Sequence, residues 1–403
     1  MFKKLDEIKV LRDPVHGYIH IDYKVIWDCV ACKEFQRLRR IKQQGSSYVV
    51  YHTAEHTRFG HSLGVYEIVR RMCNEVKGIN NNLSEEDKIV VMLAGMLHDI
   101  GHGPFSHTFE SVANVNHETY SCRIIEGDTE INKVLEQAKK GLSKKVSSVI
   151  SHTHENPVLS QMISAQLDAD RMDYLLRDAY FTGTKYGEFD LERILRTMRV
   201  KDNAIVIKES GVHSIEDYIM ARYHMYWQVY YHPVARSFEC VISALFERMR
   251  DLLAIDEHAL DGIDVFDEFL DDEEPSLLAH FLLDENSCFY GFQKLMYHQD
   301  KVLSDLSRRL LNRDLFQYED IENKKTIEKI SKKAKEAGYD PKYYVRTDEV
   351  KQRPYQPLGD DRSIWLLMEN GEVQELSSGS VIVSSLIKGK NWNDNKVFFP
   401  RGI

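Results

Sequence analysis

The stretch SEEDKIVVMLAGMLHDIGHGPFSH, residues 84–107, carries the clearest helix signal in the sequence and ends in candidate metal-binding residues. Ser84 and Asp87 form an S-x-x-D capping box, which predicts the start of a helix whose apolar run continues to about His98. Glycines follow at once and end that helix. The helix therefore ends on His98-Asp99, and an imidazole beside a carboxylate can bind one divalent cation if the helix end opens into a pocket.

The chain around this helix has a mostly helical period of apolar residues, from about residue 30 to 310. An Asp-Pro-Val-His-Gly turn at residues 13–17 and the alternating run Tyr18–Ile21 predict a short N-terminal strand or hairpin. Strand-like segments appear after about residue 335, with a hairpin turn signal at Asn370-Gly371. The predicted strands there are Tyr343–Arg346, Ile364–Met368 and Val381–Val383.

These patterns predict a mainly α protein with an all-helical core, a short N-terminal strand or hairpin and a small C-terminal α+β subdomain. We place the N-terminal segment at residues 1–30, the helical domain at 31–335 and the C-terminal subdomain at 336–403. Within the helical domain, we expect further helical stretches at 190–199 and 215–249, a short hairpin at 200–208, and a solvated acidic turn at 264–274.

The composition is that of a globular protein able to bury a core, with 403 residues of which 43% are hydrophobic. It excludes a disordered chain, a collagen-like chain and a disulfide mini-protein. Lys and Arg number 53 against 63 Asp and Glu, a formal charge of −10, which disfavours nucleic acid as the main partner. A small anionic ligand is still compatible, because a local basic pocket does not need a basic protein.

The N-terminus and the cysteines favour a cytoplasmic protein. The first residues carry acids early and no apolar run follows, unlike a signal peptide. The longest apolar run, near Ile89–Leu97, is about half of a membrane span, so we expect no membrane partner. Cys29 and Cys32 form one C-x-x-C without the second pair that a structural zinc site needs, so we interpret them as two positions on one helix turn.

Histidines are concentrated around this stretch, residues 84–107: seven of 17 lie between His52 and His117. Helix faces do not require this density, and a core histidine usually occurs singly. Further motifs surround the His98-Asp99 pair. They are Asp13–Gly17, Phe35-Gln36-Arg37-Leu38-Arg39, Arg58-Phe59-Gly60-His61-Ser62-Leu63-Gly64, Leu97–His107 and Asp170-Arg171-Met172-Asp173-Tyr174.

This ordered set resembles the HD-domain metal-dependent phosphohydrolases, whose H…HD…D pattern is matched by His61, His98-Asp99 and Asp170. The motifs are most similar to those of the deoxynucleoside triphosphate (dNTP) triphosphohydrolases. Among these, the chain looks like a bacterial homologue, without the SAM domain, of the SAM-and-HD-domain enzyme. The resemblance implies that the helical core is an HD domain.

The resemblance implies that His61, His98, Asp99 and Asp170 bind a divalent metal ion. The residue chemistry agrees with this assignment. Two neutral imidazoles and two carboxylates suit Mn, Fe, Co, Ni or Zn, whereas Mg usually prefers an oxygen shell. Such an ion polarises a phosphoryl oxygen and acidifies a bound water. The alternative is that all four residues are core residues whose polar atoms are hydrogen-bonded within the protein.

The resemblance also assigns catalytic roles to residues that follow the metal ligands. His117 and His102 are the first candidates for general acid–base chemistry, because imidazole titrates near neutral pH. Glu110 matches an acid that orients the catalytic histidine, with Glu here in place of Asp. For His107, structural hydrogen bonding and catalysis are nearly equal interpretations.

Substrate contacts are implied on both sides of the ligands. Arg58 precedes His61 by three residues, so both point to one side of a helix, and its guanidinium can fork two phosphate oxygens. Arg171 matches a basic residue for the triphosphate, and Asp178 one that binds the 3′-hydroxyl. The remaining substrate candidates are Tyr174, Arg222, Tyr230 and His232, of which Tyr230 is predicted to exclude a ribose 2′-hydroxyl; an aromatic-rich helix is otherwise ordinary core.

The resemblance further implies a homotetramer assembled by a nucleotide effector, dGTP or GTP, bound between subunits. The candidate effector contacts are Val10, Arg12, Gln36, Arg39, Lys42, Arg193 and Arg313, and each basic one could equally be a solvated surface charge. Family members that read guanine have an acid five residues before the glutamine. Here that position is Ala31 and the nearest acid is Asp28. Either the local helix is shifted by about a turn relative to theirs, or the guanine selectivity differs.

The predicted reaction is hydrolysis of a dNTP to a deoxynucleoside and inorganic triphosphate, with dGTP catabolism among the roles it would serve. Two alternatives stay open. One is an HD-type 5′-nucleotidase or phosphodiesterase, which would not release triphosphate. The other is a non-catalytic nucleotide-sensing or single-strand-binding module, which would bind without turnover.

Overall fold

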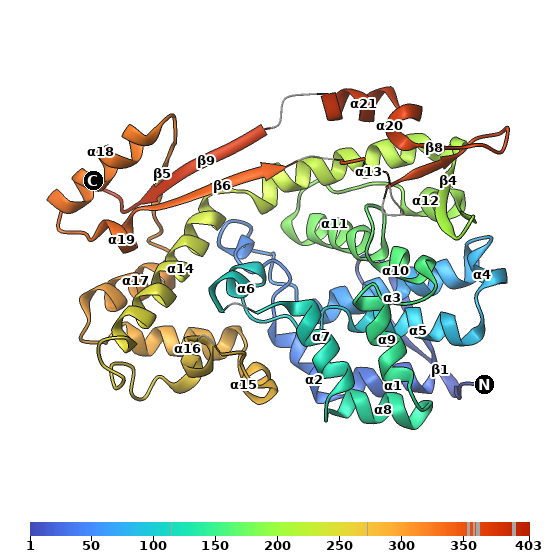
Figure 1. The fold of residues 1–403 in the computed structure, drawn as a ribbon, viewed down its shortest axis with the longest axis horizontal. Helices are drawn as coiled ribbons and strands as arrows, with labels where there is room; N and C mark the ends of the chain where they lie inside the picture. Colours follow the sequence, from blue (N-terminus) through green and yellow to red (C-terminus); the bar gives the residue numbers. More distant parts are fainter. Residues whose placement is uncertain (114, 272, 353–354, 358, 360–362, 389–391) are drawn as a thin grey trace.

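The computed structural model of the chain describes residues 1–403 except 114, 272, 353–354, 358, 360–362 and 389–391. It is mainly α-helical, with a short hairpin at the N-terminus and small sheets late in the chain, as predicted (Figure 1). No helix in the described part is both long and apolar enough to cross a membrane.

The first half of the chain forms a helical body around one hydrophobic core, to which buried residues within 207–229 and 355–383 also contribute. Its elements before the metal-ligand region are β1 (Lys4–Asp13), β2 (Gly17–Tyr23), α1 (Lys24–Ala31), α2 (Lys33–Arg37), α3 (Arg58–Glu75), α4 (Ile79–Asn82) and α5 (Glu85–Leu97). Those that follow are α6 (His107–Ala113), α7 (His117–Glu126), α8 (Glu130–Ala138), α9 (Leu142–Ile150), α10 (Pro157–Ile163), α11 (Ala169–Thr182) and α12 (Leu191–Thr197).

The second half adds a long helix, α14, around which a second core forms (Figure 1). Its helices are α13 (Val212–Met225), α14 (Pro233–Leu253), α15 (Leu277–Leu282), α16 (Glu285–Leu295), α17 (Lys301–Leu311), α18 (Lys324–Glu336), α19 (Pro341–Tyr344), α20 (Leu376–Gly379) and α21 (Val381–Lys388). Its strands are β3 (Met198–Lys201), β4 (Ala204–Lys208), β5 (Gln317–Asp320), β6 (Arg346–Gln352), β7 (Trp365–Leu367), β8 (Val373–Glu375) and β9 (Trp392–Phe399).

The capping box of α5 forms as the sequence predicts. The Ser84 hydroxyl accepts the backbone N–H of Asp87 at 3.1 Å, and α5 runs from there to its C-cap at His98. Beyond the cap, Gly101 lies against α7, where a Cβ would overlap the backbone of His117 and Ser121. This close approach fixes the His98-Asp99 end of α5 inside the body.

The late strands join two different sheets. The predicted hairpin at 200–208 forms as β3 and β4, and β7 and β8 extend it to a four-stranded sheet in the order β3-β4-β7-β8. A second sheet has the order β5-β9-β6. Strand pairs therefore join residues before and after 335, and the three-part division of the chain stays a prediction.

Two of the predicted strands are wrong. Residues 343–344 end the short helix α19, because Asp340 caps its N-terminus and Pro341 takes the first helical position. Residues 381–383 begin α21, where the Ser380 hydroxyl accepts the Val383 N–H at 3.0 Å. In this helix Val383 is buried and Val381 is exposed, so the β-branched run follows a helical face.

Two helical-region predictions also differ. The expected stretch 215–249 is divided into α13, a π-helical turn at Tyr226–Tyr230, and α14, because Pro233 cannot donate a backbone hydrogen bond to the preceding turn. The acidic stretch begins with a 3-10 helix, Asp264–Phe269, rather than a wholly solvated turn. Phe266 and Phe269 are buried there in the second core and hold that segment against the protein.

Candidate active site

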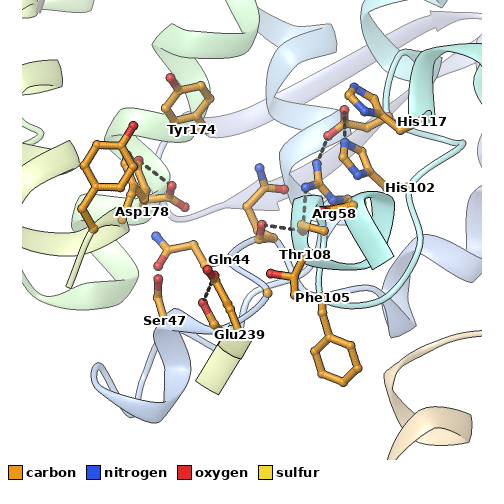
Figure 2. A pocket seen from close by; sticks show the side chains of 18 of the residues that line it. Gln44, Ser47, Arg58, His102, Phe105, Thr108, His117, Tyr174, Asp178 and Glu239 are labelled. Atoms are coloured by element: carbon orange, nitrogen blue, oxygen red, sulfur yellow. Dashed lines mark hydrogen bonds and ion pairs between the residues drawn. The ribbon is translucent and has the colours of Figure 1, made fainter. Parts of the chain in front are cut away.

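A cavity of about 880 Å³ opens beside the C-terminal end of α5, between the helical body and α14. In Figure 2, Arg58, His102 and His117 lie on one side of it and Tyr174 and Asp178 on the opposite side, with Gln44 between them. One side is therefore the expected metal and phosphate side, and the other is the expected sugar side.

Three of the predicted metal ligands converge from three helices. His61 lies in the first turn of α3, His98 caps α5 and Asp170 lies in the first turn of α11. Asp170 Oδ1 is 3.0 Å from His61 Nε2 and 3.5 Å from His98 Nε2. These three residues form a group with metal-ligand spacing.

The donor set fits a divalent cation. Nε2 of His61 and Nε2 of His98 are buried and have no hydrogen-bond partner. Each ring is oriented from its other nitrogen: His98 Nδ1 lies 2.9 Å from the carbonyl of Gly95, and His61 Nδ1 lies 2.7 Å from Asp173 Oδ2. Such contacts fix the tautomer that leaves Nε2 with a free lone pair, as is usual for metal-binding histidines.

Asp99, the fourth predicted ligand, faces both the metal group and the catalytic histidines. Its Oδ1 lies 3.2 Å from His98 Nε2 and 3.4 Å from His102 Nε2, and its Oδ2 lies 3.5 Å from His61 Nε2. Arg58 forms a buried ion pair with Oδ2. Asp99 also forms a second group with metal-ligand spacing, together with His102 and His117.

The nearby carboxylates raise the pKa of the two metal-side histidines, His61 and His98. Burial disfavours the charged ring of His61, but the negative charges of the nearby Asp170, Asp173 and Asp99 carboxylates outweigh it and raise the pKa to about 10. Burial likewise opposes the charge on His98, yet Asp99 and Asp170 raise its pKa. A cation that binds here must displace protons, so its affinity falls at low pH.

The predicted acid–base residues form a compact unit beside the ligands. The rings of His102 and His117 stack with centroids 3.9 Å apart, and Glu110 binds His117 Nδ1. Burial, together with the charges of Arg58 and His117, lowers the pKa of His102 well below its usual value. His107 opens α6, but its side chain lies outside the described part of the structure.

The segment before His107 is held in an unusual conformation. Phe105 and Ser106 have φ of 57° and 51°, in the left-handed region that glycine favours. The Ser106 hydroxyl accepts a hydrogen bond from Arg58 Nη2 at 2.8 Å, and Glu285 Oε1 accepts the Phe105 N–H at 3.3 Å. Backbone strain of this kind persists only where surrounding contacts enforce it.

The sugar side already has its own hydrogen bonds. Asp178 accepts from the Tyr230 hydroxyl at 2.7 Å and lies 2.7 Å from His56 Nε2. Tyr174 lines the cavity, with its ring centroid 6.1 Å from that of Tyr230. The predicted triphosphate contact Arg171 also lines the cavity, but its guanidinium is paired with Asp168.

Two predicted substrate residues do not line the cavity as far as the structure describes it. Arg222 has Nε and Nη1 buried without a partner, and its guanidinium lies 5.8 Å from the ring centroid of Tyr226. His232 caps α14, with Nδ1 accepting the Val234 N–H at 3.2 Å. The turn that Pro233 imposes after the π-helical segment directs His232 to this capping role.

The predicted effector contacts lie outside the cavity lining that the structure describes. On β1, Val10 is about half exposed and Arg12 lies over the Tyr18 ring. Others have local partners: Gln36 binds the Val30 carbonyl, Arg39 stacks on Phe59, Lys42 pairs with Glu55, Arg193 binds the Ser210 carbonyl and Arg313 binds the Val49 carbonyl. Their predicted role in binding a nucleotide effector is tested by measuring hydrolysis with and without dGTP.

The structure adds residues that the sequence prediction did not assign. Gln44 lines the cavity and is buried, with both amide atoms unpartnered. Glu239 from α14 and Asp348 from β6 complete the wall opposite the helical body. His56, which contacts Asp178, is a further residue that the prediction did not assign, although it is one of the clustered histidines of the sequence. Gln44, Glu239 and Asp348 carried no signal in the sequence, because packing brings their elements together.

Comparisons with known proteins agree with this geometry. The HD domain model matches residues 58–178, and the HD associated region model matches residues 189–277. Protein YwfO of Bacillus subtilis, which is uncharacterized, is 46% identical over 99% of this chain and 94% of its own length. A solved phosphohydrolase from Bacteroides thetaiotaomicron has a TM-score of 0.87 at 30% identity, covering 98% of this chain and all of its own.

A further relative carries a printed activity. The deoxynucleoside triphosphate triphosphohydrolase SAMHD1 homolog of Dictyostelium discoideum is 30% identical over 63% of this chain. That alignment covers 52% of the relative, so about half of its length has no counterpart in the match.

Proposed function

Because this chain belongs to the HD-domain family of phosphohydrolases, we propose that it hydrolyses dNTPs to a deoxynucleoside and inorganic triphosphate. One observation carries the proposal. Two buried imidazole nitrogens without partners, His61 Nε2 and His98 Nε2, face Asp170 at one edge of the cavity. The relative of D. discoideum named as a dNTP triphosphohydrolase supports the choice of substrate.

In this proposal His61, His98, Asp99 and Asp170 hold one divalent ion, with Mn, Fe, Co, Ni, Zn and Mg as candidates. When bound, the ion supplies a positive charge that polarises a phosphoryl oxygen and lowers the pKa of water. Arg58, which is buried against Asp99 at the edge of the cavity, adds a fixed positive charge beside the phosphates.

The protein's own groups handle the protons of the reaction. A water oxygen bonds to the α-phosphorus and the water gives up one proton, the bond from that phosphorus to the 5′-oxygen breaks, and the 5′-oxygen takes up one proton, so the protons balance. His117, held by Glu110 and stacked on His102, is the group we assign to this proton transfer. Glu110 orients the His117 ring as a carboxylate orients the histidine of other acid–base pairs.

The sugar side would recognise the deoxyribose. Asp178 lies 2.7 Å from His56 Nε2 and accepts from Tyr230, so a 3′-hydroxyl would join an existing network. The Tyr230 ring would leave no room for a ribose 2′-hydroxyl. We further propose a nucleotide effector, dGTP or GTP, a homotetramer and a cytoplasmic location, which rest on the family resemblance.

The decisive experiment measures inorganic triphosphate released from each dNTP with Mn²⁺ or Mg²⁺, with and without a small amount of dGTP. The variant His98→Ala removes one ligand, and His213→Ala serves as its matched control because the His213 side chain is 91% exposed. We expect triphosphate from the natural chain and from His213→Ala, and none from His98→Ala.

Each product identifies a different function. Triphosphate that forms faster with dGTP supports both the reaction and the effector. Triphosphate that forms at the same rate with and without dGTP supports the proposed reaction and excludes dGTP as its effector. No triphosphate from any dNTP with either metal would replace the proposal by the alternatives, a 5′-nucleotidase tested on nucleoside monophosphates or a phosphodiesterase.

A further inference from the structure

The turn of the N-terminal hairpin reaches the back of the metal group. β1 ends at Asp13 and β2 begins at Gly17, and the turn between them is closed by Asp13 Oδ1, which accepts the backbone N–H groups of Val15 and His16 at 2.9 and 3.0 Å. The closed turn directs the His16 side chain inward, where it is 3% exposed. A surface hairpin thus places an imidazole deep inside the helical body.

His16 meets the same carboxylate that orients the metal ligand His61. Asp173 Oδ1 lies 2.6 Å from His16 Nε2, and Asp173 Oδ2 lies 2.7 Å from His61 Nδ1. The Asp173 side chain has no exposed surface. Water therefore cannot take the place of either imidazole without a rearrangement of the core.

A second connection joins the turn to the same carboxylate. Arg177, one turn further along α11, donates from Nε and Nη2 to Asp173 at 2.9 Å each. Its Nη1 donates to Asp13 Oδ2 at 2.8 Å. Asp13 thus closes the turn with one oxygen and binds Arg177 with the other, so the turn is attached to Asp173 through two independent side chains.

Asp173 is packed closely against α3. A Cβ at Gly64 of α3 would overlap Asp173 Oδ1 and Arg177 Nη2, so α3 and α11 meet at this point without a side chain between them. With Asp173 confined in this way, the position of its carboxylate depends on the donors that surround it. Those donors are His16, His61 and Arg177.

We propose that the Asp13–Gly17 turn is a clamp that positions the metal ligand His61 through Asp173, and so sets the affinity of the site for a divalent cation. The inference rests on the metal site of the proposed function. His16 is a positioning residue: it touches neither substrate nor ion, and it acts by fixing the carboxylate that holds His61 Nδ1. Loss of an outer contact of this kind typically weakens metal binding 10–100-fold.

The test measures Mn²⁺ affinity directly, by electron paramagnetic resonance of free Mn²⁺ at pH 7.5. His16→Leu removes the donor, whereas His16→Gln retains an N–H near the position of Nε2. Tyr66→Phe is the matched control, because the Tyr66 hydroxyl donates to the His20 carbonyl at 2.8 Å and so joins the same hairpin to α3 without touching Asp173. His98→Ala defines the signal that belongs to this site.

We expect His16→Leu to bind Mn²⁺ about 10-fold more weakly, with His16→Gln and Tyr66→Phe close to the natural chain. Equal affinity of His16→Leu and the natural chain overturns the inference. So does an equal loss in Tyr66→Phe, because any loosening of the hairpin would then suffice. A natural chain that binds no Mn²⁺ at the His98-dependent site removes the metal site itself, and with it the proposed function.

Circular dichroism shows whether each variant is folded before its affinity is compared. If His16→Leu does not fold, His16→Asn replaces it, since the shorter amide cannot reach Asp173 yet stays polar. The same 10-fold loss is then expected, and unchanged affinity again overturns the inference.

Discussion

The two sides of the cavity differ in how their polar atoms are satisfied. On the metal side, Nε2 of His61 and Nε2 of His98 are buried without partners, although the opposite nitrogen of each ring is held. On the sugar side, Asp178 already has bonds to His56 and Tyr230. The two metal-side nitrogens therefore face carboxylate oxygens without a hydrogen bond to them, whereas the polar groups of the sugar side are hydrogen-bonded to one another.

This difference shows what each side is built to bind. A buried polar atom without a hydrogen-bond partner costs free energy, and two such imidazole nitrogens beside a carboxylate are the arrangement that a bound cation would satisfy. The metal side thus presents a donor set suited to a cation. A ligand on the sugar side must instead share or exchange existing hydrogen bonds, which favours selectivity over affinity.

Removing a ligand from the metal side has the largest expected effect. In Asp170→Ala the two imidazoles lose the carboxylate between them, so we expect neither Mn²⁺ binding nor dNTP hydrolysis from a folded chain. Equilibrium dialysis and the triphosphate assay measure the two properties. Asp217→Ala, at an exposed carboxylate, is the control. Full activity in Asp170→Ala would show that the metal side is misassigned.

The next largest effect separates metal binding from proton transfer. His117→Ala leaves His61, His98 and Asp170 in place but removes the ring that Glu110 orients. We expect kcat to fall about 10²–10⁴-fold while Mn²⁺ affinity is unchanged. Steady-state kinetics and Mn²⁺ titration on the same preparation test this. An unchanged kcat would exclude His117 from the chemical step.

A pH effect is expected at Glu285, the first residue of α16, which joins the segments that contain Lys42 and Phe105. Burial raises the pKa of Glu285 from 4.5 to about 7, while its Oε1 accepts the N–H groups of Lys42 and Phe105. The stability of the natural chain should therefore be highest below pH 4.5 as far as Glu285 contributes, and fall as pH rises through 7. The loss is at most about 3 kcal/mol.

Glu285→Gln should remove this part of the pH dependence, since the amide oxygen still accepts both N–H groups and does not ionise. Urea unfolding at pH 5 and pH 8 measures the difference. Glu257→Gln, at a side chain 89% exposed, should behave like the natural chain. The assignment to Glu285 fails if its variant and the natural chain lose equal stability between the two pH values.

The smallest effect is expected on the sugar side. Tyr230→Phe removes one donor from Asp178 and retains the ring, so we expect a loss of about 1 kcal/mol in stability and an unchanged preference for dATP over ATP. Urea unfolding and the ratio of kcat/KM values measure these. Tyr318→Phe, at a residue 43% exposed, is the control. A lost preference would assign selectivity to the hydroxyl rather than to the ring.

The features predicted best from the sequence are those that depend on residues near one another in the chain or on an ordered motif. The capping box at Ser84 and Asp87 forms, the hairpin at 200–208 forms, and the motif histidines His61 and His98 meet Asp170 as the family pattern implies. Helix propensity and capping are interactions within one or two turns, which a sequence displays directly.

Contacts between residues far apart in the chain depend on packing, because several partners compete for the same group. Arg171 pairs with Asp168, Asp178 is bound by His56 and Tyr230, and the late strands pair with residues before 335. The sequence alone determined which chemical groups are available and that helices carry them. Packing determines which of those groups contact one another and which have no hydrogen-bond partner. Burial raises the free-energy cost of each unpaired polar atom, because water can no longer bind it.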